Sequence, residues 1–576
     1  MVKNGQLELI NAGWSMHDEA CPTYEDMINN MMIGHDFVLE HFGVKPRIGW
    51  QIDPFGHSNT NARIFAEMGF DAWFFARLDY QDKNKRMNDK EMEFVWIPNP
   101  ESLGTDVNIL THVLYHHYSA PNGFNFETDS PDEQWINDMS SEDFNAVQEA
   151  ENLKSQLDER VDHYLTDDMF VVFGDDFRYV NAHQNYLNMD NMIEYMNANF
   201  NDTYIFKYST PSDYVDALAK HNVSWPTKYD DMFPYSDNPD AYWTGYFTSR
   251  ANDKEYIRRA SHNLHASTQL FSEKIISQTI QDTEIASILN AKDSMLNELG
   301  INQHHDAVTG TAKQHVADDY AYRLYTALET NNVVYNEAVA EKVQAFSGFG
   351  SHDPWAQCFQ TNTTYVDCPI ANQDLTNNFS MHVAIHNPSS LDFSTARIAV
   401  PNANYSVEAF DTDKQIFKLV ESNIICAADK LIGEVPVDSC FLAVNHTTAA
   451  RDISLLKVNY VVAEPKQAQP LNVGNSIESK DIKLGFAGFA TGESMLQFEF
   501  INKKTAQKEL LRVSIGNWRS QRWYNEFTDT DSQNSGDYIF RPETGQYEPD
   551  VYSNYTMNAT FMTGPVDSEM TFYFSN

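Results

Sequence analysis

The sequence predicts a multidomain protein with an α/β domain built on a parallel sheet (residues 1–250), a three-helix bundle (251–346) and antiparallel β-sandwich domains (347–576). Three observations carry this prediction. Short apolar runs alternate with helical stretches in the first part, apolar residues recur every three or four positions in the second, and apolar and polar residues alternate in the third. A chain of 576 residues has room for about four packed units.

The first part contains five short apolar runs with the composition of buried strands. Between the first two, Tyr24–Phe42 carries apolar side chains at helical spacing, and the acidic region 130–168 is expected to be helical at the surface. Strands that alternate with helices pair in parallel, because each helix carries the chain back across the sheet. The expected strands are residues 7–10, 48–52, 72–76, 109–114 and 169–173.

The second part has helical periodicity in three segments between about residues 256 and 343. Three antiparallel helices joined by short loops are the simplest arrangement of such segments. Gly300 is expected to end the second helix. The loop that follows contains Gln-His-His-Asp at residues 303–306.

The third part begins after a stretch rich in Gly, Cys and Thr, and its alternation is typical of antiparallel strands with one buried face. The chain has five cysteines, an odd count. Cys358 and Cys368 are ten residues apart in a polar loop and could form a disulfide, and Cys21 is expected to be the free thiol.

Acidic residues strongly outnumber basic ones: 82 Asp and Glu stand against 40 Lys and Arg, for a net charge of −42. This charge argues against nucleic acid and anionic membranes as partners, because both are bound through basic residues. It suits a neutral substrate and an acidic compartment, where partial protonation relieves repulsion. No apolar run approaches the roughly 18 residues of a membrane span, and the first ten residues lack the apolar stretch of a signal peptide.

Polar residues follow three of the predicted strands, and ligands of an open parallel sheet bind beyond the carboxyl ends of its strands. Two carboxylates are the minimum equipment for cleaving a glycosidic bond, and aromatic rings bind the apolar faces of sugars. Each acid could equally be a helix cap or a solvated loop residue. The residues concerned are Asp53, Arg77, Asp175 and Asp176, with Trp50, Tyr118 and Trp243 nearby in the predicted fold.

The loop residues His304, His305 and Asp306 are of the types that bind metal ions. Surface histidines beside a capping aspartate would give the same sequence. No His-Glu-x-x-His or Cys-x-x-Cys motif accompanies them, and the absence of a P-loop or Gly-x-Gly-x-x-Gly motif leaves nucleotide chemistry without support. Metal binding and a plain surface loop both stay open on these residues.

Five longer motifs occur along the chain, and a sixth, SGDYIFRP, follows at residues 535–542. The five are NAGWSMHDEA (11–20), WQIDPFGHS (50–58), FARLDYQD (75–82), YWTGYFTSR (242–250) and QHHDAVTGT (303–311). Together and in this order they resemble the motifs of family-38 glycoside hydrolases, and within that family most of all those of the lysosomal α-mannosidases. The similarity extends from the first residue to the last.

The resemblance implies retaining hydrolysis of terminal non-reducing α-mannose residues of N-linked glycans, with one Zn²⁺ in the sugar pocket. By motif, Asp53 matches the nucleophile and a zinc ligand, Asp176 the acid/base, and His305 a second zinc ligand. A retaining mechanism needs the two carboxyl groups about 5–5.5 Å apart. Matched substrate contacts are Arg77, Tyr118, Trp243, Asp306 and Tyr538. The resemblance favours a lysosomal location and leaves a homodimer open.

One departure from the family pattern concerns the metal site. Family members begin the α/β domain with a strand ending in His-x-Asp, both of which bind zinc, and Met1 falls after that strand. The resemblance therefore predicts a sheet without its first strand, two absent zinc ligands and a shortened β region. Asp53 and His305 alone fall short of the usual three protein ligands. We expect part of a longer lysosomal enzyme; the alternatives are a catalytically silent mannose-binding relative and a Golgi-type processing mannosidase.

Overall fold

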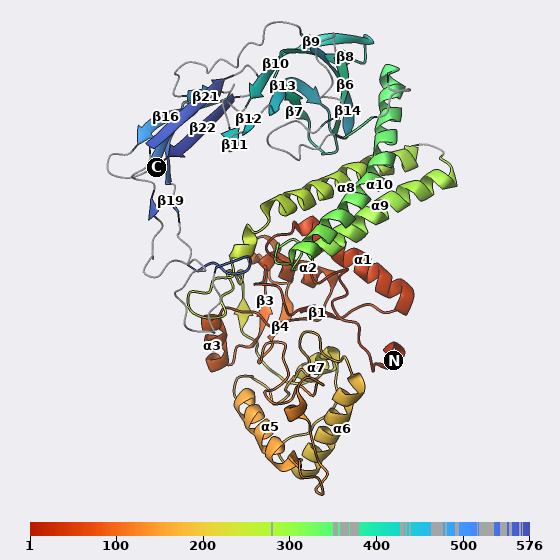
Figure 1. Ribbon diagram of the computed structural model, residues 1–576, viewed down its shortest axis with the longest axis vertical. Helices are drawn as coiled ribbons and strands as arrows, with labels where there is room; N and C mark the ends of the chain where they lie inside the picture. The colour runs from red at the N-terminus through yellow and green to blue at the C-terminus, as the bar shows by residue number, and fades with distance from the viewer. Residues whose placement is uncertain are drawn as a thin grey trace. The chain divides into compact units, whose positions relative to one another are not determined.

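The chain forms a mixed α/β structure in two compact units, each described separately below (Figure 1). Unit 1 comprises Met1–Ser261, Leu296–Leu324 and Ser520–Arg541, and unit 2 comprises the remainder. The computed structural model describes residues 1–277, 280–349, 355–357, 368, 380–426, 431–432, 435–436, 439–461, 476–478, 481–489, 495–514, 516–517, 535–541, 550–551, 556–563, 566 and 568–575.

Unit 1 is built around a sheet with the order β1-β2-β4-β3-β5. Its strands are β1 (Ile48–Gln51), β2 (Ala72–Phe75), β3 (Glu93–Trp96), β4 (Ile109–Val113) and β5 (Thr227–Lys228). The pairs β1–β2, β2–β4 and β3–β5 are parallel, and β3–β4 is antiparallel. All four residues of β2 are buried, since helices and loops cover both faces of the sheet.

Helices of unit 1 pack on this sheet and also form a second, separate core. They are α1 (Tyr24–Phe42), α2 (Asn59–Met68), α3 (Tyr80–Asp89), α4 (Pro100–Leu103), α5 (Ala146–Val161), α6 (Ala182–Asn199) and α7 (Pro211–Leu218), with short 3-10 helices at Val2–Asn4, Pro131–Glu133 and Gly245–Phe247. Helices α5 and α6 share a core that contains alanine, leucine and methionine side chains.

Three of the five predicted strands are confirmed, at 48–52, 72–76 and 109–114. The predictions at 7–10 and 169–173 are wrong, because no strand forms there. The apolar pattern of 169–173 has another cause: Phe170 and Val172 face the core of the sheet, whereas Met169, Val171 and Phe173 face the α5–α6 core. Strand β3 was missed because it begins with the charged Glu93, which is buried against His112.

Three long helices link the units: α8 (Ala251–Ser277), α9 (Asp282–Asn302) and α10 (Gln314–Ser347). The prediction that Gly300 ends the second helix is wrong, since α9 continues to Asn302. Glycine serves packing there, because a Cβ on Gly300 would lie 2.9 Å from Cδ1 of Trp14. No described helix combines the length and the apolar composition needed to cross a membrane.

Antiparallel strands follow in unit 2, with the sheet orders β6-β14-β8-β9, β10-β13-β7 and β15-β16-β17-β18 and three two-stranded pairs. In unit 2, α8–α10 pack on β6 and β14 through residues such as Phe271 and Leu455. The strands are β6 (Ser380–Asn387), β7 (Phe393–Pro401), β8 (Tyr405–Asp411), β9 (Ile416–Val420), β10 (Ser422–Cys426), β11 (Leu431–Ile432), β12 (Val435–Pro436), β13 (Ser439–Thr448), β14 (Asp452–Tyr460), β15 (Ser476–Glu478), β16 (Ile482–Phe489), β17 (Met495–Asn502), β18 (Lys508–Ser514), β19 (Gly516–Asn517), β20 (Asp550–Val551), β21 (Thr556–Thr563) and β22 (Ser568–Ser575).

The parallel sheet and the antiparallel sheets are thus present, whereas the bundle, the sandwiches and the boundaries at 250 and 346 stay predictions. Cys21 is a buried free thiol, as expected. Cys358 lies outside the described residues, so its pairing with Cys368 also stays a prediction.

Candidate active site

Asp53 and Arg77 meet at the carboxyl ends of two neighbouring parallel strands. Asp53 comes two residues after β1 ends, and Arg77 comes two residues after β2 ends. Because β1 and β2 are parallel and adjacent, their ends lie side by side. The Nε of Arg77 donates to Oδ1 of Asp53 at 2.9 Å, and Nη2 donates to the same oxygen.

His305 reaches the other oxygen of the same carboxylate from the loop between α9 and α10. Its Nε2 lies 2.9 Å from Oδ2 of Asp53, and its Nδ1 donates to the carbonyl oxygen of Met16 at 2.8 Å. Burial alone would raise the pKa of Asp53, but the hydrogen bond from His305 and the charge of Arg77 outweigh burial and hold that pKa well below its usual range. These contacts favour the ionised form of the Asp53 side chain.

An aromatic wall stands beside this carboxylate. Phe55 is buried, and its ring centroid lies 5.1 Å from that of Trp243 and 5.4 Å from that of Tyr538. The guanidinium of Arg77 sits 4.8 Å from the centre of the Trp243 ring, a cation–π contact. Trp243 is only partly buried among these side chains.

Tyr538 and Asp306 belong to the same group of side chains although 232 positions separate them in the sequence. The hydroxyl of Tyr538 donates to Oδ1 of Asp306 at 3.2 Å, and Thr311 donates to the same oxygen at 2.5 Å. The carbonyl oxygen of Tyr538 in turn accepts from the backbone N–H of Gly245 at 3.1 Å. These bonds hold the segment around Tyr538 against the loop that carries Trp243.

Tyr118 reaches the site from the segment after β4. Its hydroxyl lies 3.5 Å from Oδ1 of Asp53, at the limit of a hydrogen bond. Burial, followed by the negative charge of Asp53, raises the pKa of Tyr118, which keeps the phenol neutral and able to donate.

Asp176 stands apart from this group. It is exposed, its backbone N–H donates to Oδ1 of Asp175 at 2.8 Å, and among the described residues its side chain makes no hydrogen bond or ion pair with the other predicted site residues. Desolvation and the negative charges of Asp53 and Asp175 raise its pKa. The negative charge of Asp53 therefore contributes to the raised pKa of Asp176. The 5–5.5 Å separation of the two carboxyl groups stays a prediction.

The structure therefore brings seven of the eight predicted residues into one contact network around Asp53. Residues that sequence reasoning missed are Phe55, Thr311 and Tyr235, whose ring lies 5.9 Å from the Arg77 guanidinium. Phe55 and Thr311 lie inside two of the motifs, which was an available signal. Tyr235 lies outside all of them.

Two groups of side chains could take part in metal binding, one of three residues and one of two. Ligand atoms of His304, His305 and Asp306 lie within 4.8 Å of one another. Nδ1 of His304, however, accepts from the backbone of Asp306 at 3.1 Å. His305 and Asp53 fit a metal better, because Nδ1 of His305 is engaged by a backbone carbonyl and Nε2 faces a carboxylate. These two convergent donors are fewer than the three protein ligands of a typical catalytic zinc site.

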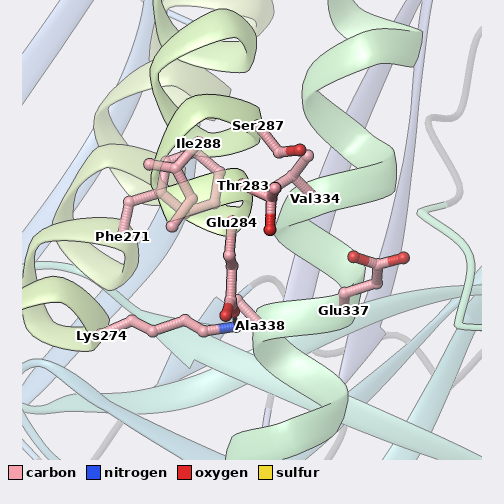
Figure 2. A pocket seen from close by; sticks show the side chains of 9 residues that line it. All are labelled: Phe271, Lys274, Thr283, Glu284, Ser287, Ile288, Val334, Glu337 and Ala338. Carbon is pink, nitrogen blue, oxygen red and sulfur yellow. Dashed lines mark ion pairs between the residues drawn. The ribbon is translucent and has the colours of Figure 1, made fainter. Parts of the chain in front are cut away.

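A cavity of about 260 Å³ in unit 2 contains none of these residues (Figure 2). It lies among α8, α9 and α10, where the amine of Lys274 forms ion pairs with Glu284 and Glu341. The positive charge of Lys274 is already balanced by these two glutamates. Among the residues that line this cavity there is no group of aromatic rings beside a carboxylate, as there is at Asp53. The site around Asp53 is the stronger candidate for sugar chemistry.

The site has a carboxylate bonded to an arginine, with aromatic rings beside it, at the carboxyl ends of parallel strands. This combination is typical of a glycoside hydrolase site. Two family matches agree with this class: residues 1–238 match the glycosyl hydrolases family 38 N-terminal domain, and residues 241–341 match the α-mannosidase middle domain. Together they span more than half of the chain. The chain belongs to glycosyl hydrolase family 38.

Individual relatives agree. The chain is 34% identical to the lysosomal α-mannosidase of Dictyostelium discoideum, over 100% of this chain and 56% of that protein. It is 31% identical to the lysosomal α-mannosidase of Homo sapiens, over 94% and 52% respectively. The chain thus spans about half the length of the curated relatives it matches. The crystal structure of an α-mannosidase from Enterococcus faecalis V583 has the same fold, with a TM-score of 0.60 and 14% identity over 100% of this chain and 59% of that one.

Proposed function

We propose that this chain carries the catalytic site of a retaining α-mannosidase, which removes terminal non-reducing α-D-mannose residues from N-linked glycans. The observation that carries the proposal is the Asp53 carboxylate, held by Arg77 and His305 beside the aromatic wall of Trp243 and Tyr538. Membership of family 38 and relatives named α-mannosidases support it.

In this proposal the two carboxyl groups divide the chemistry between them. Asp53 is the nucleophile: its carboxylate attacks the anomeric carbon and forms a covalent glycosyl ester. Asp176 first donates its proton to the leaving oxygen and then removes a proton from the water that hydrolyses the ester. The low pKa of Asp53 and the raised pKa of Asp176 suit these opposite roles.

The remaining residues bind and orient the sugar. Trp243 packs against a sugar face, Asp306 accepts hydrogen bonds from sugar hydroxyls, and Arg77, Tyr118 and Tyr538 contact the substrate. Asp53 and His305 are the residues that would hold Zn²⁺, which when bound polarises vicinal sugar hydroxyls as a Lewis acid. Orientation by these groups brings the anomeric carbon to Asp53.

We further infer a lysosomal role in glycoprotein breakdown. The relatives from D. discoideum and H. sapiens are named lysosomal, and a net charge of −42 suits an acidic compartment. A Cys358–Cys368 disulfide would suit the secretory route to that compartment.

A second candidate is a mannose-binding protein without turnover. It is favoured by one observation: the Asp53–His305 pair supplies two donors, fewer than the three protein ligands of a typical catalytic zinc site. Calorimetric titration with mannose separates the candidates. Binding that survives chelation, in a chain that hydrolyses no mannoside, supports this second candidate.

The direct test is hydrolysis of an aryl α-mannoside at acid pH with added Zn²⁺ by the purified 576-residue chain and its Asp53→Asn variant. We expect Asp53→Asn to lower kcat by about 10³-fold or more, because a carboxamide is a poor nucleophile. Asp71→Asn is the matched control, since Asp71 forms a surface ion pair with Arg47 and should be almost silent. Equal activity of Asp53→Asn and Asp71→Asn would contradict the proposal.

A further inference from the structure

A fully buried carboxylate, that of Glu19, lies behind the loop that carries Asp53. Its Oε1 accepts from Nδ1 of His57 at 3.0 Å and from Nε2 of Gln51 at 3.3 Å, and its Oε2 accepts from the backbone N–H of Ser58 at 2.8 Å. Gln51 is the last residue of β1, and Ser58 is the N-cap of α2. One side chain therefore bonds to both ends of residues 52–57, which we call the Asp53 loop.

The segment that supplies Glu19 also holds His305. The carbonyl oxygen of Met16 accepts from the backbone N–H of His305 at 3.2 Å and from its Nδ1 at 2.8 Å. Two residues further on, Asp18 N–H donates to the carbonyl oxygen of Gln303 at 2.9 Å. Residues 16–19 thus bond both to the residues that flank Asp53 and to His305. Asp53 and His305 are themselves 252 positions apart in the sequence.

The Asp53 loop is rigid on its other sides as well. His57 exchanges two backbone hydrogen bonds with Met232, and its ring stacks on Phe75 with centroids 4.0 Å apart. Gly56 has φ +115°, and a Cβ there would lie 2.6 Å from the ring of Phe233. The loop is closely packed against these neighbours, so it has no free space in which to absorb a local change. We therefore expect that losing a bond to Glu19 shifts the whole loop relative to residues 16–19.

A second buried carboxylate provides the contrast. Glu93 of β3 is 1% exposed, accepts from Nδ1 of His112 at 2.9 Å and accepts from the hydroxyl of Tyr214. Both glutamates are almost fully buried, and each has a histidine partner. Glu93, however, bonds to neither the Asp53 loop nor the segment 16–19.

We propose that Glu19 is a positioning residue: it fixes the Asp53 loop to the segment that holds His305, and so sets the placement of Asp53 relative to His305. Its catalytic consequence rests on the α-mannosidase function proposed above. Glu19 itself contacts neither Asp53 nor His305 and acts through Gln51, His57 and Ser58. A misplacement of about 1 Å at a reacting group can cost about 10²-fold in rate.

The test compares Glu19→Gln with Glu93→Gln in the full chain. Glutamine keeps the shape of the side chain, but it cannot accept on both sides, so one of the two loop ends loses its bond. We expect Glu19→Gln to lower kcat at least about tenfold more than Glu93→Gln, with KM changed less than about threefold and similar losses of thermal stability. Glu19→Asp keeps the charge but shortens the reach, and it should lose kcat in the same way.

A second readout does not depend on turnover. Hydrogen–deuterium exchange should accelerate in peptides covering 51–58 and 303–309 of Glu19→Gln, and not of Glu93→Gln. A wild-type chain without mannosidase activity would refute the proposed function, while exchange would still decide whether Glu19 holds the two loops together. Unchanged exchange in these peptides, or a kcat equal to that of Glu93→Gln in an active enzyme, would overturn the inference.

Discussion

The two candidate catalytic carboxyl groups lie in loops of opposite character. Four of the six residues of the Asp53 loop are buried, and the side chain of Asp53 itself is bonded through both oxygens. The Asp176 loop, residues 174–180, contains two non-glycine residues with left-handed backbone, Phe177 (φ 57°) and Tyr179 (φ 61°), and Phe177 is 95% exposed.

The difference matches the two roles that we propose. A nucleophile must be ionised and fixed in direction, which basic partners and burial provide. A general acid must hold a proton and reach a leaving group, which a raised pKa and an exposed position provide. The same residue type is thus directed to opposite chemistry by its surroundings, and the following changes test this contrast.

The largest expected effect is at Asp176 itself. Asp176→Asn should lower kcat/KM by about 10²–10⁴-fold for mannosides with poor leaving groups, because protonation of the leaving oxygen is lost. With a dinitrophenyl leaving group the loss should be far smaller, since that group departs unprotonated. Asp53→Asn should lose activity on both substrates. Steady-state assays on the pair of substrates decide the matter, and an equal loss of Asp176→Asn on both would remove the distinction between the two loops.

A smaller effect is expected from the neighbouring charge. Asp175 contributes to the raised pKa of Asp176, so Asp175→Asn should lower that pKa. The general acid works when protonated, and it loses its proton as pH rises through its pKa. The basic limb of the kcat/KM–pH profile should therefore move to lower pH, while the profile of the Asp71→Asn control stays in place. A basic limb that moves to higher pH would contradict the assignment.

The smallest effect is expected from a matched pair of tyrosines. In the Asp176 loop, the hydroxyl of Tyr179 donates to the carbonyl oxygen of Phe173, just before the loop, at 2.6 Å. In the Asp53 loop, the carbonyl oxygen of Phe55 accepts from the hydroxyl of Tyr246 at 3.0 Å. Each Tyr→Phe change removes one hydrogen bond worth about 0.5–1.5 kcal/mol. We expect chemical denaturation to show a loss of this size in each variant, with kcat reduced a few-fold. A fully stable Tyr246→Phe variant would show that the Asp53 loop does not depend on this bond.

The sequence predicted the strands that are apolar throughout, such as Ala72–Phe75, and the residues that lie within motifs. It missed β3 because Glu93 made a buried strand resemble a polar one, and it assigned a strand to 169–173 because one segment serves two cores. The motifs located Asp53, Arg77 and His305 but could not give their bonding. The role of Glu19 depends on contacts between segments that are distant in the sequence, which no local pattern contains.

In the proposed mechanism, Asp53 is the residue that becomes covalently attached to the sugar. A slowly turned-over fluorinated α-mannosyl fluoride, incubated with the chain and followed by proteolysis and mass spectrometry, tests it directly. We expect a single mannosyl label on the peptide that contains Asp53, and no label in the Asp53→Asn variant. A label on Asp176, or complete hydrolysis of a mannoside with inversion at the anomeric carbon, would contradict it.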